Sequence, residues 1–315
     1  MHHKKNFLKT HLYDYDKQKA NLLKSILPFV IIVHHLANLK FEGIGKIGSL
    51  GDPAMYIFFA MSGYGLVISY KKNVGYINGF LRRSLPKLFI PYLIALVLFV
   101  VYRYIEGIDQ FDLFMTKGLF SFVPTSWFIY ILSLFYIFFF VCYRFIKSNI
   151  VIKTVFTAIL VIGYCFLAPY MGISPWRYYR CPAFIVGMVF ALMDESIKEK
   201  FVRWHILVAI GLLMCMIKLP FGHRLDFFYY PSIIFFVMYS LPGGGRLRIV
   251  SFFSSISLEM FIIQFIPIYI VTNHIVLEKN FISTLIVVPL VLVLDVLIAF
   301  VMHKMVAVIK RVIQL

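Results

Sequence analysis

The sequence predicts an all-α protein, a polytopic bundle of about ten transmembrane helices with both termini in the cytoplasm. Composition, the length of the apolar stretches and the distribution of basic residues support this fold class. Of the 315 residues, 61% are hydrophobic and only 14% are charged, and the mean hydropathy is +0.87. A soluble domain carries roughly 25% charged residues. A chain this poor in charge cannot cover a water-facing surface, whereas lipid accepts apolar side chains.

Ten apolar stretches approach the length of about 20 residues that a helix needs to cross a bilayer. The predicted spans are 22–39, 52–70, 86–104, 126–146, 150–169, 181–193, 202–219, 227–242, 255–272 and 281–302. The sixth and eighth are short, and we expect them to tilt into the bundle or to meet a thinner bilayer. The chain therefore divides into a cytoplasmic tail, 1–21, and one transmembrane domain, 22–315.

The basic residues predict the orientation. With the N-terminus inside, 22 of the 31 Lys and Arg residues fall on the cytoplasmic side. Cytoplasmic loops are enriched in Lys and Arg, so this topology is favoured over its inverse. The net charge of +17 then indicates contact with anionic lipid, and we expect no nucleic-acid partner. The four cysteines lack the spacing of a metal site or disulfide framework, and we expect no metal.

Few titratable residues fall inside the predicted spans, where an unpaired charge costs several kcal/mol. They are the acids Glu259 and Asp295 and the histidines His34 and His35. Lys24 lies eleven residues before His35, so the two share one face of a helix and are roughly 16 Å apart along its axis. Lys24 either extends to the headgroups while the histidines bond to other helices, or this face presents a base to an internal cavity.

A second cluster of basic residues opens the third span. Arg82, Arg83 and Lys87 lie within six residues, between Phe80 and Pro91. Such cations usually anchor a helix at the membrane surface. They also suit a clamp for a phosphorylated ligand that arrives from the cytoplasm.

Six short motifs follow one another in the chain. They are Lys24 with His35, F-F-A-M-S-G-Y at 58–64, Arg82, Arg83, Lys87 and Pro91 in the third span, S-W-F at 126–128 with Tyr136, R-C-P-A-F-I-V-G-M at 180–188, and S-L-E-M-F-I-I-Q at 257–264. Together they resemble the acyltransferase 3 family of bacterial integral membrane O-acyltransferases. Lys24 stands where the family usually has Arg, and Gln264 stands where many members have His.

The resemblance implies an enzyme of the bacterial cytoplasmic membrane that takes an acyl group, usually acetyl, from cytoplasmic acyl-CoA. The acceptor it implies is a hydroxyl group of a cell-envelope polysaccharide or of its lipid-linked precursor. The expected partners are therefore acyl-CoA, such a glycan and membrane lipid. The sequence is also compatible with a homo-oligomer.

The resemblance also suggests roles for individual residues. Lys24, Arg82, Arg83 and Lys87 would bind the polyanionic donor. His35 would act as general base on the acceptor hydroxyl, or would carry the acyl group transiently, with Glu259 orienting its imidazole. The residues expected on the acceptor side are Arg180, Trp127, Ser62 and Tyr136.

Two other functions stay open on the sequence. A transporter or exporter of a glycan or small molecule would also carry Glu, Asp and His inside its spans. Two features of the sequence argue against a transporter: the lack of an internal repeat and the basic cluster that opens the third span. An inactive relative that serves as an assembly or sensory module is the third alternative.

Overall fold

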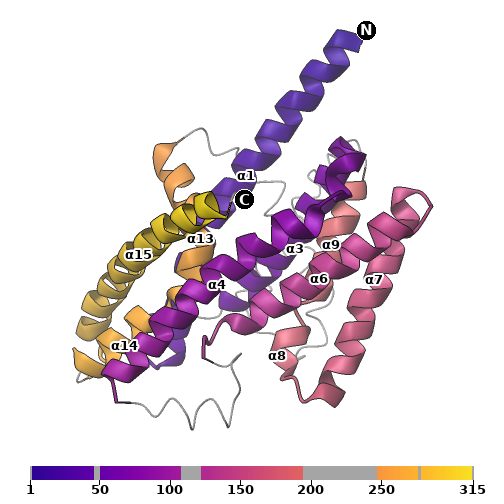
Figure 1. Ribbon diagram of the computed structural model, residues 1–315. Coiled ribbons are helices and arrows are strands. Elements are labelled where there is room, and N and C mark those ends of the chain that lie inside the picture. Colours follow the sequence, from indigo (N-terminus) through magenta and orange to yellow (C-terminus); the bar gives the residue numbers. More distant parts are fainter. Residues whose placement is uncertain (1, 46–49, 108–121, 194–246, 276–277, 314–315) are drawn as a thin grey trace. The chain divides into compact units, whose positions relative to one another are not determined.

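The computed structural model describes residues 2–45, 50–107, 122–193, 247–275 and 278–313, with side chains from residue 17 onward (Figure 1). Within these ranges the chain forms helices and no strand. It divides into two compact units. The first unit comprises Met1–Leu23, Asp52–Asn78 and Phe138–Ser251, and the second comprises Lys24–Gly51, Gly79–Ile137 and Phe252–Leu315.

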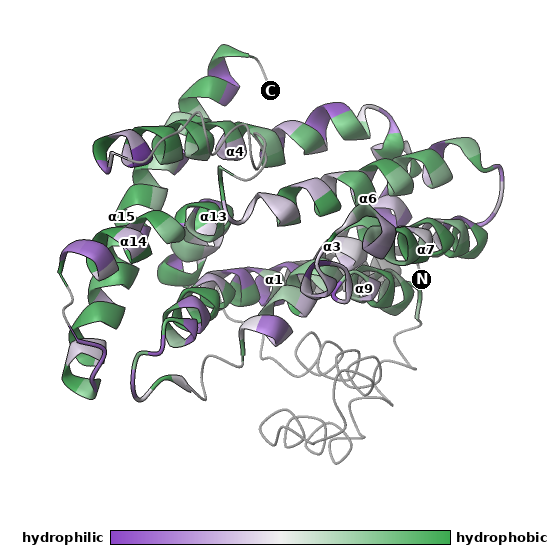
Figure 2. Ribbon diagram, turned by 90° about the horizontal axis from the view of Figure 1, so that it is seen from below, coloured by the Kyte–Doolittle hydropathy of each residue, from purple (hydrophilic) through white to green (hydrophobic). Residues whose placement is uncertain are grey.

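Six helical segments of the described chain are long and apolar enough to cross a membrane. They are Lys17–Asn38, Gly51–Lys72, Phe80–Ile105, Ser126–Phe145, Ile150–Met171 and Phe281–Val312. Arg248–Ile263 and Phe265–His274 form a pair bent by 58°, and they count as a seventh span if the pair crosses once. Hydrophobic residues predominate along α4, α7 and α15 in Figure 2. The chain is therefore an all-helical, multi-pass membrane protein.

These segments agree with seven of the predicted spans. A further prediction, 181–193, corresponds to α9 (Pro182–Leu192), which at 11 residues is too short to span a bilayer alone. The predictions at 202–219 and 227–242 lie outside the described residues. The count of ten and the cytoplasmic position of both termini therefore stay predictions, as does the division into a tail and one domain.

The two largest differences between predicted and observed helix boundaries concern α1 and α15. Helix α1 (His2–Asn38) begins inside the predicted tail and continues through Pro28. Helix α15 (Phe281–Val312) extends ten residues beyond the predicted end at 302. Apolar residues continue past that point, and Met302 and Val306 are buried. Packing against neighbouring helices thus favours helix beyond the predicted end of the span.

In the first unit, glycines allow helices α3 (Gly51–Lys72) and α9 to touch through their backbones. A Cβ atom at Gly63 would lie 2.1 Å from the Phe184 carbonyl oxygen, and one at Gly187 would lie 1.9 Å from that of Ala60. Small residues permit this approach between membrane helices. Both glycines belong to the recognised motifs, so packing explains part of those motifs.

Two lysines of the first unit donate hydrogen bonds to uncharged oxygen atoms. Lys71 Nζ donates to the Ala191 carbonyl oxygen at the end of α9 (3.0 Å). Lys153, near the start of α7 (Ile150–Leu167), is buried and donates to Tyr70 Oη (2.8 Å) and to the Tyr143 carbonyl oxygen (3.1 Å). These bonds tie α7 to α3 and α6.

The second unit contains α4 (Phe80–Ile105), α13 (Arg248–Ile263) from Phe252 onward, α14 (Phe265–His274) and α15. Helix α15 packs against α4 and α14 (Figure 1). Its buried residues recur every three or four positions, as expected for one helix face. They are Thr284, Val287, Val291, Asp295, Ala299, Met302 and Val306.

The part of α6 (Ser126–Phe145) that belongs to the second unit packs against α13. Thr125, just before α6, donates to the Ile262 carbonyl oxygen (3.1 Å), and the rings of Phe128 and Phe261 are 5.0 Å apart. These contacts hold α6 beside the end of α13 where the chain bends.

Candidate active site

His35 lies near the end of α1 in the second unit. Its half-buried ring lies 4.5 Å from that of Phe265, the first residue of α14. Lys24, on the same helix, is exposed. Because α1 is continuous between them, the axial separation of roughly 16 Å expected from the sequence applies here.

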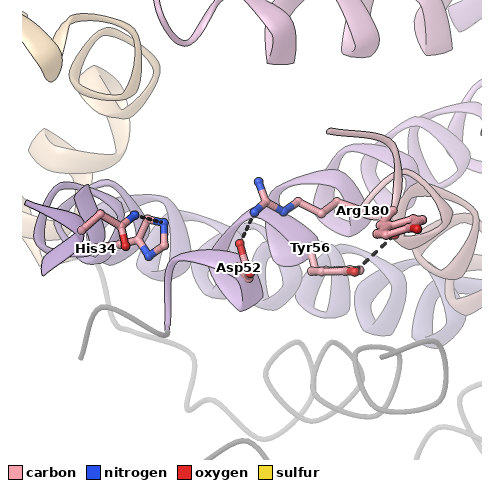
Figure 3. A network of polar contacts seen from close by, with 6 residues as sticks. His34, Asp52, Tyr56 and Arg180 are labelled. Carbon is pink, nitrogen blue, oxygen red and sulfur yellow. Dashed lines mark hydrogen bonds and ion pairs between the residues drawn. The ribbon is translucent and has the colours of Figure 1, made fainter. Parts of the chain in front are cut away.

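The neighbouring His34 has different contacts. The Asn38 side-chain amide donates to His34 Nε2 (3.1 Å), as drawn in Figure 3. A Cβ atom at Gly51 would lie 2.2 Å from His34 Cγ, so the absence of a side chain at Gly51 leaves the space that the His34 ring occupies. His34 is therefore fixed by packing and a neutral hydrogen bond.

Glu259, on α13, is buried and contacts a histidine that the sequence analysis did not select. His303 Nδ1 donates to Glu259 Oε1 (2.9 Å), and the side chains are 34% and 5% exposed respectively. A role of Glu259 in orienting His35 stays a prediction, because the contact described for its carboxylate is with His303.

Two further polar side chains are buried in the second unit. Asp295 is fully buried, and neither carboxylate oxygen has a hydrogen-bond partner among the described residues. Gln264 lies at the bend between α13 and α14, where its amide donates to the Phe261 carbonyl oxygen (2.9 Å). Its own Oε1 has no partner in the described chain. A buried polar group without a hydrogen-bond partner lowers stability by about 1–3 kcal/mol. Such groups are typical of functional regions.

The predicted donor-binding residues all lie in the second unit. Arg82, Arg83 and Lys87 occupy the first turns of α4 and are exposed, as is Lys24 on α1. Their binding role stays a prediction.

Arg180, predicted on the acceptor side, forms an ion pair with Asp52 in the first unit (Figure 3). The Arg180 side chain is 12% exposed and that of Asp52 is 43% exposed. Beside them, Tyr56 Oη donates to the Tyr179 carbonyl oxygen (3.2 Å). The pair joins the start of α3 to the segment between α8 (Pro175–Tyr178) and α9.

The other residues predicted on the acceptor side have ordinary packing contacts. Ser62 Oγ donates to the Phe58 carbonyl oxygen one turn earlier (2.9 Å). The ring of Trp127 lies 6.1 Å from that of Phe128, and the ring of Tyr136 lies 5.6 Å from that of Phe80. Trp127 and Tyr136 belong to the second unit, Ser62 and Arg180 to the first, and their acceptor-binding roles stay predictions.

The sequence analysis missed Asp52 and His303. Asp52 is the first residue of the predicted second span, where an acid is unremarkable at the membrane surface. His303 is one residue beyond the predicted end of the tenth span. The apolar pattern of Met302, Met305 and Val306 was the signal that the helix continues past it.

A family model described as an acyltransferase domain matches residues 18–304, which is most of the chain. The protein thus belongs to the acyltransferase 3 family. No curated protein and no solved structure matches it. Together, the family and the apolar helices define a multi-pass membrane acyltransferase.

Proposed function

We propose that this protein is a membrane O-acyltransferase that moves an acetyl group from cytoplasmic acetyl-CoA to a hydroxyl group of a cell-envelope polysaccharide or its lipid-linked precursor. The observation that carries the proposal is the family match over residues 18–304. The bacterial cytoplasmic membrane, where a cytoplasmic donor and an envelope acceptor meet, is the proposed location.

The donor end of the proposed site consists of exposed cations. Coenzyme A carries several negative phosphate charges. Arg82, Arg83 and Lys87 in the first turns of α4, and Lys24 within α1, offer positive charge in the second unit. Arg supplies paired donors to phosphate oxygens, which favours binding through charge-assisted hydrogen bonds.

The proposed chemical step uses His35. Its imidazole removes the proton from the acceptor hydroxyl, the oxygen attacks the thioester carbonyl carbon, and the carbon–sulfur bond breaks. In the alternative, His35 itself takes the acyl group and passes it to the acceptor. A half-buried imidazole, roughly 16 Å along α1 from Lys24, supports either role.

The first test compares two adjacent histidines. His35→Ala should lower transfer of labelled acetyl from acetyl-CoA to an envelope extract by at least about 100-fold, because general bases contribute about 10²–10⁴-fold. His34→Ala is the matched control, and it should keep most of the activity. Full activity in His35→Ala together with loss in His34→Ala would move the base to His34.

The second test concerns the donor. Replacing both Arg82 and Arg83 with Gln should raise the KM for acetyl-CoA, with a smaller effect on kcat, because binding would be lost in ground and transition states alike. An unchanged KM would exclude these arginines from the donor site.

A further inference from the structure

The contact between Glu259 and His303 is a buried acid–imidazole pair for which the proposed function has no role so far. Nδ1 of His303 faces the carboxylate at 2.9 Å, and the His303 side chain keeps 34% of its surface exposed. Because Nδ1 is engaged by the carboxylate, Nε2 remains the nitrogen that can serve a ligand.

Both members of the pair lie in the second unit, away from the ends of the helices that carry them. Glu259 is eleven residues from the start of α13 and His303 is nine from the end of α15, which is roughly 16 Å and 14 Å inside these helices. Two ring contacts join α1 to the α13–α14 segment, Phe29–Phe253 at 5.1 Å and His35–Phe265 at 4.5 Å. Glu259 lies midway between Phe253 and Phe265 in the chain.

Acyl transfer from a thioester requires a proton at its donor end. When the carbon–sulfur bond breaks, its electron pair stays on sulfur. A thiolate within the apolar part of a bilayer costs several kcal/mol if it stays charged. A proton donor beside the departing sulfur removes this cost.

We propose that His303, held by Glu259, donates the proton that converts the departing coenzyme A thiolate into the thiol. This inference rests on the proposed function. His35 gains the acceptor's hydroxyl proton, and His303 Nε2 loses a proton to sulfur. His35 then releases its proton to water, and His303 takes up a proton from water. The net reaction therefore moves only the acyl group and one proton.

The helices packed against α15 carry charged and titratable residues of their own. Helix α15 is in contact with α13, α14 and α4. Within the second unit, their described charged and titratable residues, with those of α15 itself, are Glu259, Tyr269, His274, Arg82, Arg83, Lys87, Tyr92, Tyr102, Arg103, Tyr104, Asp295, Lys304, Lys310 and Arg311. Among the printed contacts within this part of the chain, Glu259 is the acid paired with His303.

The test begins with His303→Gln, which cannot carry the proton. We expect kcat for transfer from acetyl-CoA to fall by about 100-fold or more, with an unchanged KM for acetyl-CoA. The matched control is His274→Gln. It breaks another His–Glu contact of the second unit, His274 Nε2 to Glu106 Oε1 at 2.7 Å, and should leave kcat unchanged.

A structural role alone would also lower activity, so two further readouts are needed. Imidazole in the buffer should restore transfer by His303→Ala in proportion to the imidazolium concentration. The fall of kcat at alkaline pH, expected when the proton donor becomes neutral, should be absent in His303→Gln. If that variant does not fold, Glu259→Gln decides, because losing the carboxylate that holds Nδ1 should lower kcat with an unchanged KM for acetyl-CoA.

Each outcome is decisive. A near-normal kcat in His303→Gln, an effect on KM alone, or a near-normal kcat in Glu259→Gln would overturn the inference and leave the proposed function intact. A wild-type protein that binds acetyl-CoA and transfers no acyl group would overturn both.

Discussion

At the residue scale, Arg180 depends on Asp52. The guanidinium is mostly buried, and its partner carboxylate is partly exposed. A charge that loses its partner is destabilised, although solvent around Asp52 reduces the effect to about 1 kcal/mol. We therefore expect Asp52→Asn to lower the Tm in detergent by about 1–2 °C.

The double variant Asp52→Asn with Arg180→Gln isolates this interaction. Its loss of stability should be smaller than the sum of the two single losses, because both variants remove the same ion pair. Additive losses would show that the pair contributes nothing to stability.

The residue scale also shows how far sequence reasoning reached. The sequence placed Glu259 and Asp295 inside predicted spans, and both are buried in the structure. It did not predict the partner of Glu259. That partner depends on how α13 and α15 are aligned over a separation of 44 residues, and no local pattern encodes such an alignment.

At the element scale, the crossing of α3 and α9 depends on two glycines. A methyl group at Gly187 would meet the Ala60 carbonyl oxygen at 1.9 Å, and backbone cannot move away as a flexible side chain does. Gly187→Ala should therefore lower the free energy of unfolding by about 1–3 kcal/mol, measured by thermal or denaturant unfolding in micelles.

Gly65, also on α3, is the matched control. An added Cβ atom there meets nothing within 4 Å. Ala favours helix over Gly by up to about 1 kcal/mol, so Gly65→Ala should leave stability unchanged or raise it. Equal destabilisation by both substitutions would contradict close α3–α9 packing as the cause.

The bend of 58° between α13 and α14 belongs to the same scale. The sequence predicted one span over 255–272, because apolar residues flank Gln264 on both sides and the segment as a whole is apolar. The helix breaks where the buried Gln264 side chain bonds to the Phe261 carbonyl oxygen. Composition reports that a segment is apolar, whereas a break depends on bonds within the folded bundle.

At the scale of the whole molecule, contacts between connecting segments agree with the predicted alternation of sides. In the first unit, Arg144 donates to Asn78 Oδ1 (2.6 Å), and both residues were predicted inside. In the second unit, the Phe281 amide donates to Glu42 Oε2 (3.1 Å), and both were predicted near the outer surface. Such contacts relate segments on one side and leave open which side is cytoplasmic.

Cysteine labelling would determine the orientation. In a variant whose four native cysteines are replaced, we expect Glu278→Cys to react with an impermeant maleimide on intact cells. Val74→Cys, which replaces an exposed residue between α3 and α4, should react only after permeabilisation. This follows from the excess of Lys and Arg in the segments predicted inside. The reverse labelling pattern would show that the topology is the inverse of the predicted one.

By itself, the sequence determined the all-helical membrane class, six of the spans and the family, because hydropathy and short motifs are properties of the local chain. The tertiary structure decided the pairs Glu259–His303 and Asp52–Arg180 and the glycine contacts of α3 with α9. These join residues far apart in the chain. Only the packed helices fix their relative register and rotation, and with them the residues that meet.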